Sequence, residues 1–220
     1  ATAGADTIDA GDGLDVVSYD SAVTMAQSAT SGAWAITAGA DEQTVSHVEI
    51  VTDTAGRTLL VGNGGFATIQ DALDEAQAGD TILIAEGTYA GGFTIATEGL
   101  TLKAVGDVVI EGNFRQNNGI AEGASVAEWL QGVAAYAGGE YAAITIAADD
   151  VTLEGLAITN FNLGILLSAS IDDLALTDVD ISSGITGIRK STAATIDGLT
   201  ITGGSEQASA SNRASGSASR

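Results

Sequence analysis

The sequence VTLEGLAI at residues 151–158 is followed 23 positions later by LALTDVDI at residues 174–181. The shift places Leu153 on Leu176 and Ile158 on Ile181, so apolar residues recur at matching positions of two segments. A fixed period of this length is typical of repeat proteins, in which each repeat stacks on its neighbours and buries a continuous core. We therefore predict a coiled ribbon of short strands with these side chains inside.

The periodicity extends in both directions from this repeat. Ile165 superimposes on Ile188 at the same shift of 23 residues. A shift of 20 places Leu176 on Ile196 and Ile181 on Ile201. A longer shift of 51 places residues 93–95 and 100–102 on residues 144–146 and 151–153. The spacing indicates coils of about 20 to 23 residues, one of which has been expanded.

The expansion lies at about residues 113–143, where Val126, Trp129, Leu130 and Val133 recur at helical spacing. We expect an excursion that carries a short helix. Its aromatic residues Trp129, Tyr136 and Tyr141 are candidates for stacking on sugar rings, although packing of an amphipathic helix on the wall of the coil explains Trp129 equally well.

A second signature, TIQDALDEAQAGDTILIAEGTY, occupies residues 68–89. Thr68 can cap a helix that carries Asp71 at its third position, Gly79 can end that helix, and a buried strand follows over residues 80–89. The segment resembles the opening of pectin-lyase-like proteins. That resemblance implies a right-handed parallel β-helix over residues 63–203 with an N-terminal capping helix, and it implies no particular activity.

Residues 1–18 divide into two nine-residue units, ATAGADTID and AGDGLDVVS. They resemble the repeats-in-toxin (RTX) nonapeptide, in which a glycine-rich turn binds calcium and a short strand points one apolar residue inward. The resemblance implies Ca²⁺ held by carboxylates and leaderless, type I export. The corresponding carboxylates are Asp6, Asp9, Asp12 and Asp15. Two units do not complete a calcium site of the RTX family. The alternative interpretation, a pair of turns that binds no metal, therefore stays open.

The remaining segments complete a three-part organisation. Residues 19–62 alternate like strands and join the nonapeptide turns in a β-rich segment over residues 1–62, while the Ser/Ala/Gly-rich residues 204–220 indicate a flexible tail. The single histidine, His47, has no neighbouring His or Cys, so a strand or turn position is favoured over metal binding. The last coil has no obvious lid, so three outcomes are expected: the natural protein continues, the tail folds over the coil, or subunits associate end to end.

Composition excludes several classes of function. The 29 acidic and 7 basic residues give a net charge of −22, which argues against nucleic acid and anionic membranes and favours divalent cations. No apolar run is long enough to span a bilayer. The chain has no cysteine and no proline, and continuous strand ladders disfavour proline. An all-β fold with one or two helices is expected.

Four carboxylates mark one turn of the predicted coil. Asp149 and Asp150 align with Asp172 and Asp173 by the 23-residue shift, which places them about 5 Å apart in neighbouring coils. Carboxylates that close repel unless they are compensated, so a Ca²⁺ site is one interpretation. The other is that these residues accept hydrogen bonds from turn amides.

A catalytic interpretation falls on Arg189 and Lys190, with Asp178 and Asp180 in the same coil. Polysaccharide lyases of this fold use calcium-bound carboxylates and a basic side chain to remove an α-proton. No lyase motif surrounds these residues, and the motifs of pectin methylesterases and alginate epimerases are missing. A charge pair exposed to solvent is the alternative.

These observations favour a secreted, extracellular or cell-surface module of bacterial type. We expect it to be stabilised by Ca²⁺, to be structural or to bind polysaccharide, and to lack catalytic activity. The second possibility is a fragment of a lyase, epimerase or hydrolase that acts on acidic glycans.

Overall fold

The computed structural model describes residues 6–29, 32–112, 142–161, 163–182, 186–191 and 195–203. These residues contain nineteen strands and one helix, so the predicted all-β class is confirmed. Within this part of the chain no helix is long and apolar enough to cross a membrane. The predicted excursion at 113–143 lies outside the described residues except for its last two, and the predicted tail at 204–220 lies wholly outside them.

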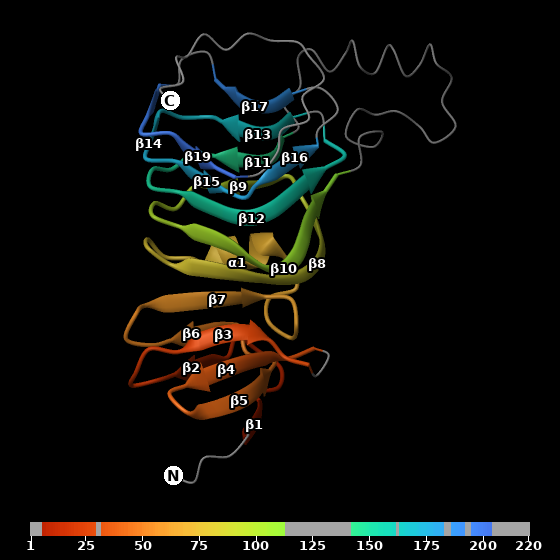
Figure 1. Ribbon diagram of the computed structural model, residues 1–220, viewed down its shortest axis with the longest axis vertical. Coiled ribbons are helices and arrows are strands. Elements are labelled where there is room, and N and C mark those ends of the chain that lie inside the picture. The colour runs from red at the N-terminus through yellow and green to blue at the C-terminus, as the bar shows by residue number, and fades with distance from the viewer. Residues whose placement is uncertain are drawn as a thin grey trace, which may run out of the picture.

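The strands pile up along the longest axis of the molecule, with β1 at one end and β17 at the other (Figure 1). A nine-stranded sheet runs through most of the pile. Its strands are, in spatial order, β2 (Val16–Ser18), β6 (Ile50–Thr52), β7 (Arg57–Val61), β8 (Thr81–Ala90), β10 (Thr101–Glu111), β12 (Thr152–Thr159), β15 (Ala175–Thr177) and β19 (Thr200–Thr202), with β16 (Asp180–Ser182) also paired to β12.

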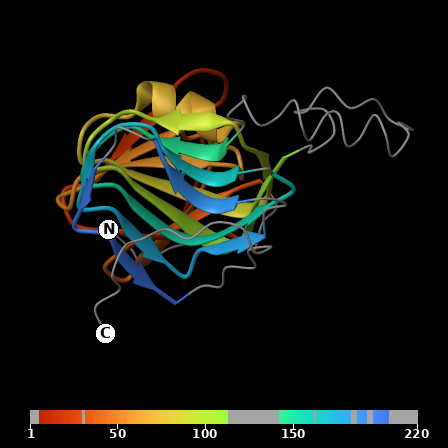
Figure 2. The same ribbon diagram turned by 90° about the horizontal axis from the view of Figure 1, so that it is seen from above.

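Three smaller sheets complete the architecture (Figure 2). The N-terminal sheet contains β1 (Asp6–Asp9), β5 (Asp41–Ser46), β4 (Trp34–Ala38) and β3 (Thr24–Gln27). The C-terminal sheet contains β9 (Phe93–Ile95), β11 (Ala142–Ile146), β13 (Leu163–Leu167) and β17 (Thr186–Lys190). A two-stranded sheet contains β14 (Ile171–Asp172) and β18 (Ile196–Asp197).

From β8 onward the chain alternates between the nine-stranded sheet and the smaller sheets, and the pairings that join β7 to β19 are parallel. The antiparallel pairs, β3–β4, β4–β5 and β6–β7, belong to the N-terminal third. The N-terminal and nine-stranded sheets are therefore mixed, whereas the C-terminal and two-stranded sheets are parallel. Because β7 pairs with β8, the N-terminal strands β2 and β6 continue the same sheet.

The register confirms most of the predicted repeat. Leu153 pairs with Leu176 and Ile158 with Ile181, and the 51-residue shift places Leu102 on Leu153. The last shift was wrong: Ile201 pairs with Leu176 at a shift of 25, not with Ile181 at 20. Apolar residues recur five positions apart in both segments, so shifts of 20 and of 25 residues both place apolar residues on apolar residues. Only the strand pairing shows that the shift is 25.

One row of aliphatic side chains crosses the nine-stranded sheet, and we call it the aliphatic column. Each member pairs with the next: Val16, Ile50, Leu59, Ile82, Leu102, Leu153, Leu176 and Ile201. The six inner members are at most 3% exposed and belong to the main core cluster. Burying a side chain of this size stabilises a fold by about 1.5–3 kcal/mol, so the column is a major source of stability.

The predicted helix forms, but it is shorter than expected. Helix α1 (Ile69–Glu75) begins after Thr68, whose hydroxyl accepts a hydrogen bond from the N–H of Asp71, as predicted. It ends at Ala76 and not at Gly79. The N–H of Gln77 donates to Asp80 and that of Gly79 donates to Glu98, so this backbone pairs with other segments and leaves the helix. Buried Ile69, Ala72 and Leu73 place α1 against β7, β8 and β9.

Candidate functional site

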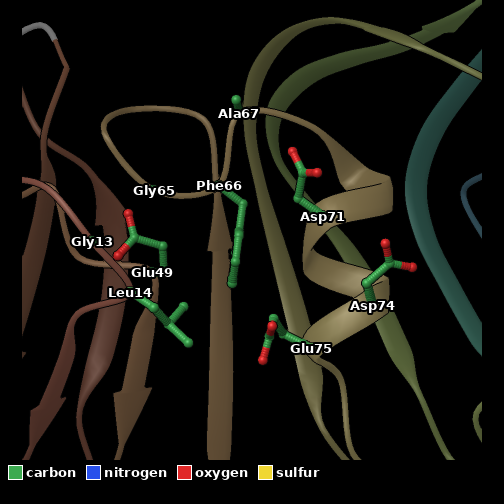
Figure 3. A pocket seen from close by; sticks show the side chains of 9 residues that line it. All are labelled: Gly13, Leu14, Glu49, Gly65, Phe66, Ala67, Asp71, Asp74 and Glu75. Atoms are coloured by element: carbon green, nitrogen blue, oxygen red, sulfur yellow. The ribbon is translucent and has the colours of Figure 1, made fainter.

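A pocket of about 480 Å³ lies between the N-terminal turn and helix α1 (Figure 3). Its lining is acidic with an apolar floor, and consists of Gly13, Leu14, Glu49, Gly65, Phe66, Ala67, Asp71, Asp74 and Glu75. In Figure 3, Glu49 and Leu14 lie on one side, and the three carboxylates of α1 lie on the other. The pocket therefore favours cations.

A tight glycine turn positions the floor of the pocket. The N–H of Gly62 donates to the carbonyl of Phe66, and that of Phe66 donates to the carbonyl of Leu60. A Cβ at Gly65 would lie 2.2 Å from the carbonyl oxygen of Leu60, so glycine alone permits this approach. The turn holds Phe66 between β7 and α1, and Phe66 is buried.

The opposite side is held by contacts between two turns that are distant in sequence. The backbone N–H of Asp15 donates to Oε2 of Glu49 at 2.8 Å. In return, the N–H groups of Glu49 and Ile50 donate to the carbonyl of Asp15. The turn that contains Asp15 therefore packs on the turn that precedes β6, and the carboxylate of Glu49 is bonded to the backbone of Asp15.

The side-chain carboxylate of Asp15 has one oxygen in an unusual environment. Its Oδ2 is buried and has no hydrogen-bond partner among the described residues. A buried carboxylate oxygen without a donor costs free energy, and a cation is one way to compensate it. Glu49 supplies a second carboxylate nearby, and Gly11 and Gly13, at φ of 91° and 132°, give the turn its open backbone.

The other predicted calcium residues of this region are spread over two structures. Asp6 and Asp9 lie on β1 of the N-terminal sheet, while exposed Asp12 lies in the turn that leads to β2 of the nine-stranded sheet. In the described part of the chain, no three His, Cys, Asp or Glu side chains gather closely enough to hold a metal alone. A calcium site here therefore needs backbone carbonyls or water as further ligands, which Ca²⁺ accepts.

His47 forms an exposed ion pair with Asp9 of β1. Its Nδ1 lies 2.7 Å from Oδ1 of Asp9, and both side chains are more than half exposed. The hydrogen bond to Asp9 raises the pKa of His47, and the hydrogen bond to His47 lowers the pKa of Asp9. His47 lies in the turn between β5 and β6, at φ 54°, as the sequence favoured.

The predicted aspartate pairs occupy turns whose backbones are hydrogen-bonded to each other. Oδ1 of Asp149 accepts a hydrogen bond from the N–H of Asp172 at 2.9 Å, and the N–H of Asp150 donates to the carbonyl of Asp172. Asp150 and Asp173 occupy equivalent left-handed positions, at φ of 57° and 52°. At least one of these carboxylates therefore accepts a hydrogen bond from a backbone amide of the neighbouring turn.

The predicted catalytic residues lie on different sheets. Arg189 and Lys190 are exposed on β17 of the C-terminal sheet. Asp178 lies at the bend between β15 and β16, and Asp180 begins β16, both associated with the nine-stranded sheet. The strand registers do not pair the basic residues with either aspartate. The three candidate sugar-stacking residues, Trp129, Tyr136 and Tyr141, lie outside the described residues.

Two features of the site were not predicted from the sequence. Glu49 has no motif around it and meets Asp15 only because two turns 34 residues apart pack together. The guanidinium of Arg57 reaches buried Asp80 and also donates to the carbonyl of Glu75, which ties β7 to the end of α1.

Comparison of the chain with protein-family models, curated proteins and solved structures finds no significant match.

Proposed function

We propose that residues 63–203 form a right-handed parallel β-helix that begins with helix α1 and extends a β-roll-like N-terminal segment. Parallel pairing from β7 to β19, alternation between sheets, and repeated register shifts support this assignment. Within the proposal, the chain is a secreted, extracellular structural or carbohydrate-binding module that Ca²⁺ stabilises. It reaches the outside by the leaderless route that the RTX resemblance implies.

The observation that carries the calcium part is the buried Oδ2 of Asp15, which has no hydrogen-bond partner in the described part of the chain, in a residue whose backbone N–H bonds to Glu49. Ca²⁺ is a hard cation that prefers carboxylate and carbonyl oxygens, and the turn offers both. The excess of negative charge on the chain adds a general attraction for divalent cations. Ca²⁺ bound there would connect the RTX-like turn to the turn before β6 and so stabilise the N-terminal coil. The aspartates at 149, 150, 172 and 173 form a second, weaker candidate.

Thermal unfolding with and without calcium tests this part. A ligand that binds only the folded chain at about 100 times its Kd adds about 2.7 kcal/mol of stability, so added Ca²⁺ should raise the Tm and EDTA should reverse the rise. Asp15→Asn should reduce that rise by more than half. Asp107→Asn, which changes an exposed carboxylate at the bulge of β10, is the matched control and should leave it unchanged. An equal calcium response in both variants would contradict the proposed site.

The carbohydrate part depends on the predicted sugar-stacking residues and has a separate test. The chain has two tryptophans, and Trp34 is buried with its Nε1 bonded to the carbonyl of Gly62. A change in fluorescence on adding alginate or pectin oligosaccharides should therefore report on Trp129, and Trp129→Phe should abolish it. If the fluorescence does not change, carbohydrate binding is contradicted and a purely structural role is favoured. Release of unsaturated uronate from either polymer would favour the enzyme fragment instead.

A further inference from the structure

The tight turn between β7 and α1 connects two hydrophobic core clusters. The carbonyl of Gly62 accepts hydrogen bonds from Nε1 of Trp34 and from the N–H of Gly65. Trp34 belongs to the cluster that contains side chains of the N-terminal sheet, whereas Phe66, at the end of the turn, belongs to the main core cluster. A change in the backbone of this turn therefore reaches both clusters.

The same turn contains an asparagine that is followed by glycine, Asn63 and Gly64. The backbone nitrogen of Gly64 can bond to Cγ of Asn63, because glycine has no side chain to hinder the approach. The bond closes a succinimide ring, and the side-chain nitrogen leaves as ammonia. Water then opens the ring at Cγ to give aspartate, or at the main-chain carbonyl carbon to give isoaspartate, whose backbone path is longer by one carbon.

The structure leaves both reacting groups of this pair accessible. Asn63 is partly exposed and adopts a left-handed conformation, at φ 48°. Within the described part of the chain, neither its side-chain amide nor the N–H of Gly64 makes a hydrogen bond. No hydrogen bond therefore has to break before the ring forms, and water reaches the site.

Asn160 provides a comparison within the same chain. It is also left-handed, at φ 60°, but its Nδ2 donates to Oε1 of Glu111 at 2.8 Å. The next residue is Phe161, whose side chain is packed in the core and is 2% exposed. The attacking backbone nitrogen would therefore belong to a residue that packing holds in place. One hydrogen bond and one buried ring hinder at Asn160 the chemistry that is unhindered at Asn63.

We propose that Asn63 is a site of spontaneous deamidation, and that isoaspartate formed there opens the turn between β7 and α1. The turn has no room for a longer backbone. A Cβ at Gly64 would lie 2.8 Å from the carbonyl oxygen of Gly32, and a Cβ at Gly65 would lie 2.2 Å from that of Leu60. An additional backbone carbon at residue 63 forces the turn away from these neighbours.

Opening of the turn weakens the contacts that it holds. The longer path separates the N–H of Gly65 from the carbonyl of Gly62, the same carbonyl that accepts from Trp34. Phe66, whose N–H and carbonyl both bond within this turn, loses its fixed position between β7 and α1. Conversion to ordinary aspartate keeps the backbone path and lacks this effect. The modification consumes only water, and it is independent of calcium and of the proposed function.

Ageing of the full chain in neutral buffer, followed by tandem mass spectrometry, tests the site. Loss of the amide at Asn63 should be at least about tenfold faster than at Asn160, a ratio that corresponds to a barrier difference of about 1.4 kcal/mol. Assignment of each change to a residue separates Asn63 from Asn118, which also precedes a glycine. Equal rates at Asn63 and Asn160 would overturn the proposal. So would an Asn63 that keeps its amide in the folded chain and loses it in urea.

Thermal unfolding of the aged samples tests the opening of the turn. The aged wild type should contain a population with a lower Tm, and this population should grow in proportion to the isoaspartate at residue 63. Asn63→Gly accepts the left-handed conformation and has no amide, so its Tm should stay constant during ageing. Freshly prepared Asn63→Asp adds the charge without the backbone carbon and should melt like fresh wild type. Isoaspartate at residue 63 without any change in Tm would disprove the opening.

Discussion

The ring of Phe161 occupies the space that a side chain at Gly112 would need. A Cβ built at Gly112 would come within 2.5 Å of the ring, and a Cβ at Gly91 would come within 2.4 Å. We expect Gly112→Ala to destabilise the protein by about 1–3 kcal/mol through overpacking. Because Phe161 is almost completely buried, Phe161→Ala should cost about 3–5 kcal/mol. Chemical denaturation measures both.

Two controls separate crowding from backbone strain. Gly92→Ala places a Cβ in open space at a left-handed φ, so its cost reports the conformation alone. In the Phe161→Ala background, the penalty of Gly112→Ala should disappear, because the ring that causes it is gone. Additive costs in the double variant would disprove the proposed contact.

Removal of the partly buried Arg57 side chain should destabilise the protein more than removal of an exposed basic side chain. Its guanidinium bonds to Asp80, which is 5% exposed, and to the carbonyl at the end of α1. Arg57→Ala leaves a buried carboxylate with one remaining donor, the N–H of Gln77, and should cost about 3–5 kcal/mol. Lys103→Ala breaks an exposed ion pair with Glu154 and should cost less than about 1 kcal/mol. Equal losses would mean that burial does not govern the Arg57 pair.

The His47–Asp9 pair predicts a limited pH dependence of stability. The folded chain raises the pKa of His47 above its ordinary value of 6.5, so the pair stabilises fully below that value and loses its effect as the pH rises through the raised pKa. The pKa of Asp9 is lowered, so the effect is present above 3.8 and is lost as the pH falls through the lowered pKa. The Tm difference between wild type and Asp9→Asn should therefore be largest between these values and should shrink in salt. A difference in Tm that does not change with pH would contradict a stabilising role of the His47–Asp9 pair.

Gly198 should be intolerant of substitution for two independent reasons. It adopts φ 68°, and a Cβ there would lie 2.0 Å from Oδ1 of Asp173, which follows the paired strand β14. Gly198→Ala should lower the free energy of unfolding by more than Gly79→Ala, which meets strain at φ 84° but no neighbour. Thermal melts of the two variants give the comparison, and identical shifts in Tm would show that Asp173 does not crowd this turn.

Local patterns were predicted well. The cap at Thr68 and the strand after Asp80 depend on neighbouring residues, and the 23-residue repeat depends on side-chain type alone. The end of α1 and the shift of the last coil were wrong because each is decided by a partner elsewhere in the chain. Asp80 captures the N–H of Gln77, and Leu176 selects Ile201 over the equally apolar Ile196.

The candidate site was predicted only in part, for the same reason. The sequence indicated Asp15 through the nonapeptide pattern and aligned Asp149 with Asp172, whose backbone contact the structure contains. It gave no sign of Glu49 or of the helix carboxylates on the far side of the pocket, because a pocket formed by separate turns has no local pattern. Burial of one oxygen of Asp15 is a property of packing and cannot be read from composition.

The register of β12 has a consequence for engineering. Its Glu154 meets Lys103 across 51 residues of chain, whereas Asp149 meets Asp172 across 23, yet both contacts join adjacent strands or turns. Closing the longer segment costs only about 0.7 kcal/mol more in chain entropy, because that cost grows with the logarithm of length. Foreign sequence, including a whole guest domain with nearby termini, should therefore be accepted between β10 and β11 with little loss of stability, which makes this position a natural place for grafting new activities.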